Sequence, residues 1–569
     1  MSRKEKMIIS GILLVVALLA SLPLLGNSIY AAPVMSHDTF FHTQRIMSIK
    51  NALLEGQLPV RIYSEIYEGY GYGASLYYPD IFLYFPAVLC ILGVPLATSY
   101  NIFLILVNIA TLFIAYYSYS HIAKDRMLGA VAASFYTLST YRFLDLYTRG
   151  AVGELLALTF CPLILCGLTL LKRGELDKWW VVMLGYTGIL QSHILSFVML
   201  AVMGVLYVAF HLKYFLNIKA ICCVLKAGSL WLLLNLWFLL PFLKEMQALP
   251  VWGTPNFWST GARVVQLFDV FLNSVIGTEV FGGPIENSIP KTPGVLLIFG
   301  AVLLLLAMIL YRDKMQGERK RILGCLLPGV LATLMVTNIF PWELIRQIPG
   351  LRGFFPKFQF MWRFNVLAIL FLSLAAAYGF YYFFMRNAGN KLRAFILVSI
   401  VPCVFSMIFT NQFVRQAGQF ENQEVLRNGY MDMMYLAPGF DYISEGVIES
   451  NLQEIWCTDA VQDGNGFSCQ LQYDADGVVL GEAYVDVPLT YYTGYRAYLD
   501  GTPLDTTCST KGIVRILLPV QKDGGYLEVR YEDGFLIGIG NIVSLIMWII
   551  LMLGGIVRKG WRKRPLSSV

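Results

Sequence analysis

Long apolar segments, separated by short polar stretches, dominate the chain. A run of about twenty apolar residues is long enough to cross the hydrocarbon core of a membrane as a helix. We therefore predict an α-helical polytopic membrane protein of about twelve spans, of which 127–140 and 179–193 are short enough to be tilted or broken. The predicted spans cover residues 7–26, 98–120, 127–140, 153–171, 179–193, 195–210, 220–243, 293–311, 322–338, 362–385, 394–411 and 535–557.

The composition agrees with this pattern. The chain has 569 residues, of which 57% are hydrophobic and 14% charged, and its mean hydropathy is +0.61. Soluble globular proteins carry about 25% charged residues. These values exclude a soluble enzyme and a nucleic-acid-binding protein. The net charge of +6 fits basic residues gathered on one side of a membrane.

Basic residues gather in alternate loops between the apolar segments. Cytoplasmic loops of membrane proteins are enriched in Lys and Arg, so this alternation predicts a plasma-membrane protein with both termini in the cytoplasm. The first apolar segment lacks a small-x-small cleavage site before Tyr30 and is predicted to be an uncleaved anchor. The basic clusters are Arg3/Lys4/Lys6, Lys124/Arg126, Lys172/Arg173/Lys178, Lys213/Lys219, Arg312/Lys314/Arg319/Lys320/Arg321, Arg386/Lys391/Arg393 and Arg558/Lys559/Arg562/Lys563/Arg564.

The long loops then fall on the extracytoplasmic side. Loops of this length are usually functional rather than simple connections. We predict three domains: a transmembrane domain with a catalytic first loop, a β-rich exterior domain, and a last helix with a basic tail. Their bounds are 1–411, 412–534 and 535–569, and the exterior loops are 27–97, 141–152, 244–292, 339–361 and 412–534.

Residues 440–534 change character, because short apolar runs alternate there with polar residues. All five Asp-Gly pairs of the chain occur in this region, and Asp-Gly suits tight hairpin turns. We therefore predict an antiparallel β-sandwich, which either caps the membrane domain or grips a polymeric acceptor. Cys457 and Cys469 flank the turn Asp463-Gly464-Asn465-Gly466, where a disulfide and two free thiols are both open.

The first exterior loop contains the most informative polar pattern. If a helix runs from residue 38 to residue 55, Asp38, His42 and Arg45 form one stripe that points toward protein. A second polar stripe, made of Gln44, Ser48, Asn51 and Glu55, would face water. Buried ionisable groups are paired or functional. The structural alternative is that Asp38 or Ser36 caps the helix while His42 and Arg45 form a local ion pair.

The apolar segment 76–94 follows this helix. A span here would invert the charge parity of everything downstream, so we predict an interfacial helix, with Asp80 on its surface.

An exterior loop with an aspartate just after the first span resembles the membrane-embedded glycosyltransferases of the GT-C superfamily. The chain more narrowly resembles the bacterial YfhO family, although Tyr495 stands where that family often has Trp. Such sequences are sometimes labelled as related to 6-pyruvoyl-tetrahydropterin synthase, but no soluble zinc-histidine site supports pterin chemistry. The matching pieces are His37-Asp38 with His42 and Arg45, Gly56-x-x-Pro59-x-Arg61, Gly71-x-Gly73 before Tyr78-Pro79, Tyr141-Arg142 with Arg149-Gly150 and Glu154, Phe355-Pro356 to Arg363, and Tyr491-Tyr492-x-Gly494-Tyr495 with Asp500-Gly501.

The resemblance implies transfer of a sugar from a polyprenyl-phosphate donor to an extracytoplasmic acceptor, such as teichoic acid or another glycan, with inversion. The acceptor hydroxyl must lose a proton, for which we predict Asp38 as general base. The leaving phosphate needs cations. The predicted assisting or acceptor-side residues are His42, Arg45, Asp145 and Glu154, of which Glu154 is alternatively a partner of Arg149. The predicted donor-phosphate residues are Arg149, His193, Arg352, Lys357 and Arg363.

We predict no metal, because the sequence lacks a tight acidic cluster; a divalent ion shared by Asp38 and a second-loop acid is the less favoured alternative. Two other functions compete with transfer. A lipid or glycan transporter would use the charged stripe for gating, but no internal repeat is visible. A non-catalytic membrane scaffold would leave the inward stripe unexplained.

Overall fold

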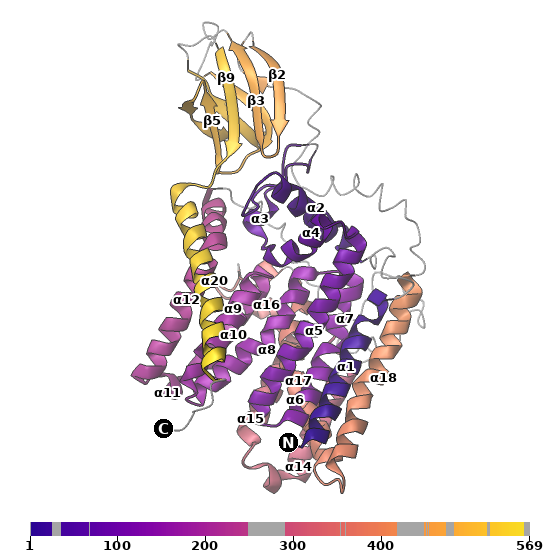
Figure 1. The fold of residues 1–569 in the computed structure, drawn as a ribbon. Helices are drawn as coiled ribbons and strands as arrows, with labels where there is room; N and C mark the ends of the chain where they lie inside the picture. The colour runs from indigo at the N-terminus through magenta and orange to yellow at the C-terminus, as the bar shows by residue number, and fades with distance from the viewer. Residues whose placement is uncertain are drawn as a thin grey trace, which may run out of the picture. The chain divides into compact units, whose positions relative to one another are not determined.

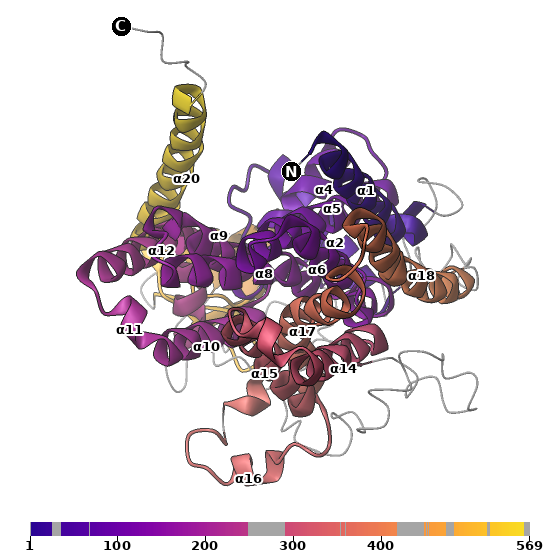
Figure 2. The same ribbon diagram turned by 90° about the horizontal axis from the view of Figure 1, so that it is seen from below.

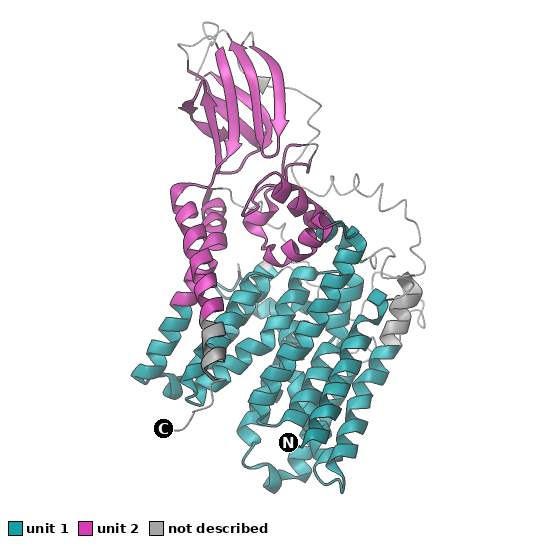
Figure 3. Ribbon diagram, in the orientation of Figure 1, with its two compact units in different colours: residues 1–43, 93–228, 252–423 teal, residues 44–92, 229–251, 424–569 magenta. Residues whose placement is uncertain are grey.

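The computed structural model describes residues 2–25, 36–67, 69–248, 291–352, 354–358, 360–417, 449–450, 452, 455–473, 483–519 and 524–562. Contacts within the chain divide it into two compact units, coloured separately in Figure 3. Unit 1 comprises residues 1–43, 93–228 and 252–423, and unit 2 comprises 44–92, 229–251 and 424–569. The boundaries of these two units differ from those of the three predicted domains. The division into three domains stays a prediction.

The secondary-structure elements of unit 1, over its described residues, are helices. The helices α8 and α17 form its interior, where most of their side chains are buried. Helix α17 packs against α14 and α15, which lie beside it in Figure 2, and α5 packs against α6 and α8. The main helices are α1 (Arg3–Leu25), α5 (Leu96–Ala123), α6 (Arg126–Thr137), α8 (Val152–Lys172), α9 (Trp179–Leu190), α10 (Ile194–Phe210), α14 (Val295–Leu310), α15 (Arg319–Val336), α17 (Asn365–Phe380) and α18 (Lys391–Ala417).

Short helical pieces connect these helices. They include a π-helical segment, η2, directly before α8. The pieces are α7 (Thr140–Phe143), η2 (Leu144–Arg149), η3 (Leu176–Lys178), α11 (Leu212–Phe215), η6 (Arg312–Met315), α16 (Trp342–Arg346), η7 (Phe355–Phe358), η8 (Met361–Phe364) and η9 (Tyr381–Met385).

Every predicted span coincides with a helix (Figure 1). Among the described residues, six helices are long and apolar enough to cross a membrane, and three shorter helices are also apolar. Helices α6 and α9 have 12 residues each, fewer than the roughly 20 that a perpendicular span requires. The protein is therefore a helical membrane protein, while the count of twelve spans and the orientation of the termini stay predictions.

Unit 2 contains a β-rich C-terminal region, as predicted. One antiparallel sheet has the strand order β1-β4-β8-β7, and the other has the order β2-β3-β9-β5-β6. Both sheets contribute side chains to one apolar core, which is the arrangement of a sandwich. The strands are β1 (Glu449–Ser450), β2 (Ile455–Asp463), β3 (Gly466–Tyr473), β4 (Tyr484–Thr490), β5 (Tyr495–Leu499), β6 (Thr502–Leu504), β7 (Thr506–Cys508), β8 (Ile513–Leu517) and β9 (Gly524–Tyr531).

Asp-Gly turns form two of the hairpins in this region. Asp500 and Gly501 both have positive φ, 49° and 76°, and they join β5 to β6. Asp463 and Gly464 begin the turn between β2 and β3. Cys457 and Cys469 lie on these two adjacent strands as free thiols.

Unit 2 also contains much of the first exterior loop. Ile62 and Leu76 belong to the core of the β domain, and the Tyr492 hydroxyl accepts a hydrogen bond of 2.8 Å from the Gly73 amide. The predicted interfacial helix 76–94 is instead three short pieces, because the chain leaves α3 at Tyr78-Pro79. The remaining helices of unit 2 are α3 (Ala74–Tyr77), η1 (Ile81–Leu83), α4 (Tyr84–Ile91) and α20 (Phe535–Arg562); α2 (Thr39–Leu54) and α12 (Ile218–Ala248) contribute residues to both units.

Candidate active site

Asp38 lies directly before α2 and is held by the backbone of the second predicted exterior loop. Its amide donates a hydrogen bond of 2.8 Å to the Arg149 carbonyl, and the His37 amide donates one of 3.1 Å to the Thr148 carbonyl. The predicted helix after Asp38 is confirmed as α2. Two segments that are distant in sequence are thereby joined, and the Asp38 carboxylate is brought near the side chains of the second loop.

Gly150 makes this close approach possible. Its φ is +64°, a left-handed conformation that glycine adopts without steric cost. A Cβ atom at this position would lie 2.0 Å from the Ser36 hydroxyl oxygen. The sequence Arg149-Gly150 therefore combines a cation with the one residue type that fits against the chain before Asp38.

Glu154, in the first turn of α8, is the centre of a buried charge cluster. Its carboxylate accepts hydrogen bonds from Arg149 at 3.0 Å, from Arg363 at 3.3 Å and from the Tyr141 hydroxyl at 2.5 Å. Arg149 also donates to Asp145 at 2.5 Å. Buried charges are tolerated only when they are paired, and this cluster pairs two acids with two guanidinium groups.

Arg149 keeps donors that the cluster does not use. Both of its hydrogen bonds to carboxylates come from Nη1. A guanidinium has five N–H donors, and Nε and Nη2 of Arg149 have no hydrogen-bond partner among the residues that the structure describes. Its side chain is 13% exposed, so a ligand can reach it.

The Asp38 carboxylate differs from the other acids of the site. It is exposed on one side and has no hydrogen-bond partner among the described residues. The protein on its other side raises its pKa above the usual 3.8, because burial disfavours the charged form. Arg149 opposes that shift most strongly, and His37 and Arg363 oppose it further, because positive charge near the carboxylate favours its ionised form.

Asp145 is fully buried on the π-helical segment η2. Its Oδ1 binds Arg149, whereas its Oδ2 has no hydrogen-bond partner in the described part of the chain. Burial, and then the Glu154 carboxylate, raise the pKa of Asp145, while Arg149 opposes them. A buried carboxylate with one unsatisfied oxygen is costly for the folded state and typical of a functional site.

Two further predicted phosphate residues join the cluster. Arg363, 7% exposed, donates to Glu154 and also to the Phe358 carbonyl at 3.0 Å. His193 caps α10 by accepting from the Ser196 amide, and it lies within electrostatic range of Arg363 and Glu154. Asp38, Asp145, Arg149, Glu154, His193 and Arg363 are thus brought together in unit 1.

The remaining predicted site residues lie elsewhere or are not described. Arg352 is exposed and makes no side-chain hydrogen bond or ion pair with the described residues. The side chain of Lys357 lies outside the described set. His42 is 2% exposed, and its ring meets Phe41 edge-on with centroids 5.1 Å apart.

Arg45 belongs to a separate buried network in unit 2. It donates hydrogen bonds of 3.0 Å to the carbonyls of Tyr78 and Pro79, and its guanidinium lies over the Tyr78 ring. Asp80 accepts from Tyr63 at 3.0 Å and is 2% exposed. The prediction that Asp80 lies on a helix surface is therefore wrong: the carboxylate is one of the groups that hold this loop together.

The two stripes predicted for α2 are only partly correct. His42 and Arg45 are buried, but Ser48 of the predicted water-facing stripe is also buried, at 3% exposure. Gln44 and Asn51 are half-buried, and Glu55 alone of that stripe is exposed. Protein therefore surrounds more of the helix than its polar pattern indicates.

Two residues beside the cluster, Tyr141 and Lys291, are not among the site residues predicted from the sequence. Tyr141 was noted within a motif, but its hydrogen bond to Glu154 was not foreseen. Lys291 lies over the Trp362 ring at 4.2 Å, and burial together with Arg149 lowers its pKa. Its signal in the sequence is a single cation directly before a predicted span, on the side where basic residues are not expected.

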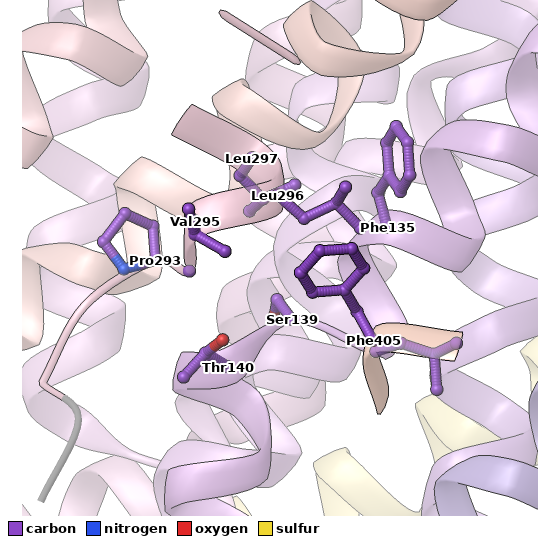
Figure 4. A pocket seen from close by; sticks show the side chains of 10 residues that line it. Phe135, Ser139, Thr140, Pro293, Val295, Leu296, Leu297 and Phe405 are labelled. Atoms are coloured by element: carbon purple, nitrogen blue, oxygen red, sulfur yellow. The ribbon is translucent and has the colours of Figure 1, made fainter. Parts of the chain in front are cut away.

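A small cavity of about 20 Å³, lined by apolar side chains together with Ser139 and Thr140, adjoins the charged cluster along the chain. Figure 4 shows Phe135, Thr140, Pro293 and Phe405 around it. Thr140 directly precedes Tyr141, and Pro293 lies two residues after Lys291, so the pocket and the cluster share their supporting segments.

No group of three or more His, Cys, Asp and Glu side chains is arranged to hold a metal within the described ranges. Asp145 and Glu154 are already bound by arginine, which is a poor environment for a cation. The metal-free site stays a prediction.

No family model matches the chain. An uncharacterized protein of Lactococcus lactis subsp. cremoris is 24% identical over 342 residues, which cover 58% of this chain and 54% of that protein. Among solved structures, the oligosaccharyltransferase AglB of Archaeoglobus fulgidus, in complex with an inhibitory peptide and a dolichol-phosphate, has a TM-score of 0.42 at 12% identity. The arabinofuranosyltransferase AftD from Mycobacteria has a TM-score of 0.43 at 16% identity.

These likenesses are partial. The match to AglB covers 73% of this chain and 56% of that one, and the match to AftD covers 73% and 27%. The chain thus spans about half or less of the proteins that it matches, and the low TM-scores assign neither a family nor an activity.

Proposed function

We propose that the protein is a membrane glycosyltransferase that moves a sugar from a polyprenyl-phosphate donor to an extracytoplasmic glycan, such as teichoic acid, with inversion at the anomeric carbon. The observation that carries this proposal is the pairing of an exposed carboxylate, Asp38, with a buried cluster that presents Arg149 to the same place. A sugar-phosphate transfer needs one base and one anion site, and the two lie together in unit 1.

Asp38 is suited to act as the base. Its carboxylate is accessible, and no hydrogen-bond partner among the described residues competes with an incoming hydroxyl. Its raised pKa makes it a better proton acceptor than an ordinary aspartate. As the acceptor oxygen attacks the anomeric carbon, its proton passes to Asp38 and the bond to the phosphate oxygen breaks on the opposite face.

Arg149 is suited to hold the leaving phosphate. Its Nη1 is fixed by Asp145 and Glu154, so the guanidinium is oriented before the donor arrives, and its remaining donors are those that a phosphate requires. Preorganised donors of this kind stabilise charge that develops in the transition state.

The test is to incubate the purified full-length protein with a panel of polyprenyl-phosphate sugars, with and without glycan acceptors. We expect release of lipid phosphate that depends on the acceptor. Asp313→Asn is the control variant, because Asp313 is exposed and distant in sequence from the site. Movement of an intact sugar-lipid between membrane leaflets, without cleavage of its phosphate bond, would show a transporter instead.

A further inference from the structure

A second charged pocket lies in unit 1, away from the residues of the candidate active site. It has a volume of about 1030 Å³, including open solvent, and lies between the end of α8 and the α11 region. Its lining includes Lys172, Arg173, Lys213 and Tyr214, and no acidic residue. Three cations around one cavity repel each other, and a bound anion would relieve that repulsion.

Arg173, one of the residues that line this pocket, binds the C-terminal end of α5. It donates hydrogen bonds of 2.6 Å to the carbonyls of His121 and Ile122, at the end of α5. Arg321 donates to the next carbonyl, Ala123, at 2.9 Å. The last carbonyls of a helix carry partial negative charge, and these two arginines satisfy them. Arg173 therefore forms a fixed wall of the pocket.

Lys172 and Lys213 are the two cations that face the pocket without an acidic partner. Neither has a carboxylate within 4 Å among the residues that the structure describes. Both lysines lie near aromatic rings: the Lys172 ammonium is 5.8 Å from the centre of the Tyr207 ring and 5.7 Å from that of Tyr214, and the Lys213 ammonium is 5.1 Å from that of Tyr214. Gly174 leaves open space within 4 Å of where a Cβ would stand.

The chain beside this pocket exposes several apolar side chains. Exposed fractions reach 83% for Phe210, 63% for Leu216 and 72% for Ile218. A free phosphate ion would leave these side chains uncovered. An amphiphile would satisfy both features, because its anionic group pairs with the lysines while its acyl chains cover the apolar residues.

We propose that this pocket binds the phosphate-bearing headgroup of an anionic phospholipid. Lys172 and Lys213 contact the phosphate, the Tyr214 ring packs between them, and the apolar residues of α10 to α12 contact the acyl chains. The site is independent of the proposed glycosyltransferase activity, because none of its residues belongs to the Asp38 cluster.

The test measures phosphatidylglycerol retained by the purified full-length protein, by native mass spectrometry during detergent exchange, against phosphatidylcholine. We expect preferential retention of phosphatidylglycerol. Each basic residue near a membrane surface contributes about fivefold to such binding, so Lys172→Gln with Lys213→Gln should reduce retention by roughly 25-fold. Lys172→Arg with Lys213→Arg should keep most of it, which separates charge loss from misfolding.

The matched control is Lys4→Gln with Lys6→Gln, which removes the same charge from an exposed basic segment. Its retention of phosphatidylglycerol should equal that of the unmodified protein. Equal losses in both double variants would overturn the proposal, because they would show a diffuse charge effect. Displacement of the lipid by millimolar inorganic phosphate would also overturn it, in favour of a site for a free anion.

Discussion

Glu154 accepts hydrogen bonds from Arg149, Arg363 and Tyr141, and so holds two guanidinium groups in the interior of unit 1. Its neutralisation would leave both buried cations with weaker compensation. Breaking a buried ion pair by removing one partner costs about 3–5 kcal/mol. We therefore expect Glu154→Gln to lower the apparent melting temperature strongly.

Thermal unfolding of the purified protein in detergent measures this effect. Asp313→Asn serves as the control, because it removes an exposed acid. If Glu154→Gln has the same melting temperature as the unmodified protein, Glu154 does not compensate the charge of the two arginines. That result would contradict its place at the centre of the cluster.

The pH dependence of transfer follows from Asp38. A base acts only when it is deprotonated, and burial raises the pKa of Asp38 above 3.8. The rate should therefore fall tenfold per pH unit below the raised pKa, starting at a higher pH than for an ordinary aspartate. A pH–rate profile of kcat/KM checks this, and a rate unchanged down to pH 4 would contradict it.

The raised pKa of Asp38 affects the stability of the fold in the direction opposite to its effect on the transfer rate. Because the folded state binds this proton more tightly, the group stabilises the protein below pH 3.8 and loses that contribution as pH rises through the raised pKa. Asp38→Asn should therefore raise the apparent melting temperature at neutral pH. A lower melting temperature would show that Asp38 is a structural acid rather than a strained functional one.

The alternative prediction that Glu154 pairs with Arg149 agrees with the structure, because local sequence determines the positions of both side chains. Asp145, Arg149 and Glu154 lie within ten residues of one another, so their proximity follows from the chain. Asp80 was misplaced because its partners, Tyr63 and Ser75, come from a loop whose path depends on tertiary contacts. Lys291 was missed for the same reason: Arg149, its neighbour, is far away in sequence.

At the scale of elements, the turn at Gly150 between η2 and α8 distinguishes the candidate site, because its backbone has a positive φ and approaches Ser36 closely. Gly150→Ala adds a strained left-handed alanine, at about 1–2 kcal/mol, and a collision with Ser36. Gly174→Ala is a matched control, since its φ is +82° but nothing lies within 4 Å of the new Cβ. We expect transfer activity to fall much further in Gly150→Ala.

Activity and thermal unfolding of the two alanine variants, measured side by side, separate the effects. Both variants should be less stable than the unmodified protein, because each places an alanine at a positive φ. Equal activities would mean that the contact between Gly150 and Ser36 does not position Asp38.

The helices could be predicted from the sequence, because an apolar segment of about twenty residues is typical of a membrane-spanning helix. The segment 76–94 was not, since its apolar composition hides the break at Tyr78-Pro79, whose carbonyls Arg45 binds. The hairpins at Asp463 and Asp500 followed from their Asp-Gly turns. The pairing order of the strands did not, because it depends on long-range contacts.

At the scale of the whole molecule, unit 2 joins the first loop to the C-terminal helix through Arg61. This residue is 3% exposed and binds Asp533, Asn541 and the Trp237 carbonyl. Arg61→Gln should lower the melting temperature and speed proteolysis within unit 2, with a loss of about 3–5 kcal/mol. Arg530→Gln, whose ion pairs are half-exposed, should leave the stability of unit 2 almost unchanged.

Limited proteolysis with mapping of the cleavage sites measures this difference. Cleavage that is equally slow in both variants would show that the Arg61 network does not hold unit 2 together. The sequence had indicated Arg61 only as part of a motif, since nothing local reveals a partner more than 400 residues away.

The most direct test of the account is donor binding and sugar transfer by Asp38→Asn, measured with the same polyprenyl-phosphate sugar. Because asparagine cannot accept the proton, transfer should fall by about 10²–10⁴-fold while donor affinity stays within about threefold. Transfer at the unmodified rate would contradict Asp38 as the general base. Loss of donor binding together with transfer would equally contradict it, by showing that Asp38 holds the donor rather than activating the acceptor.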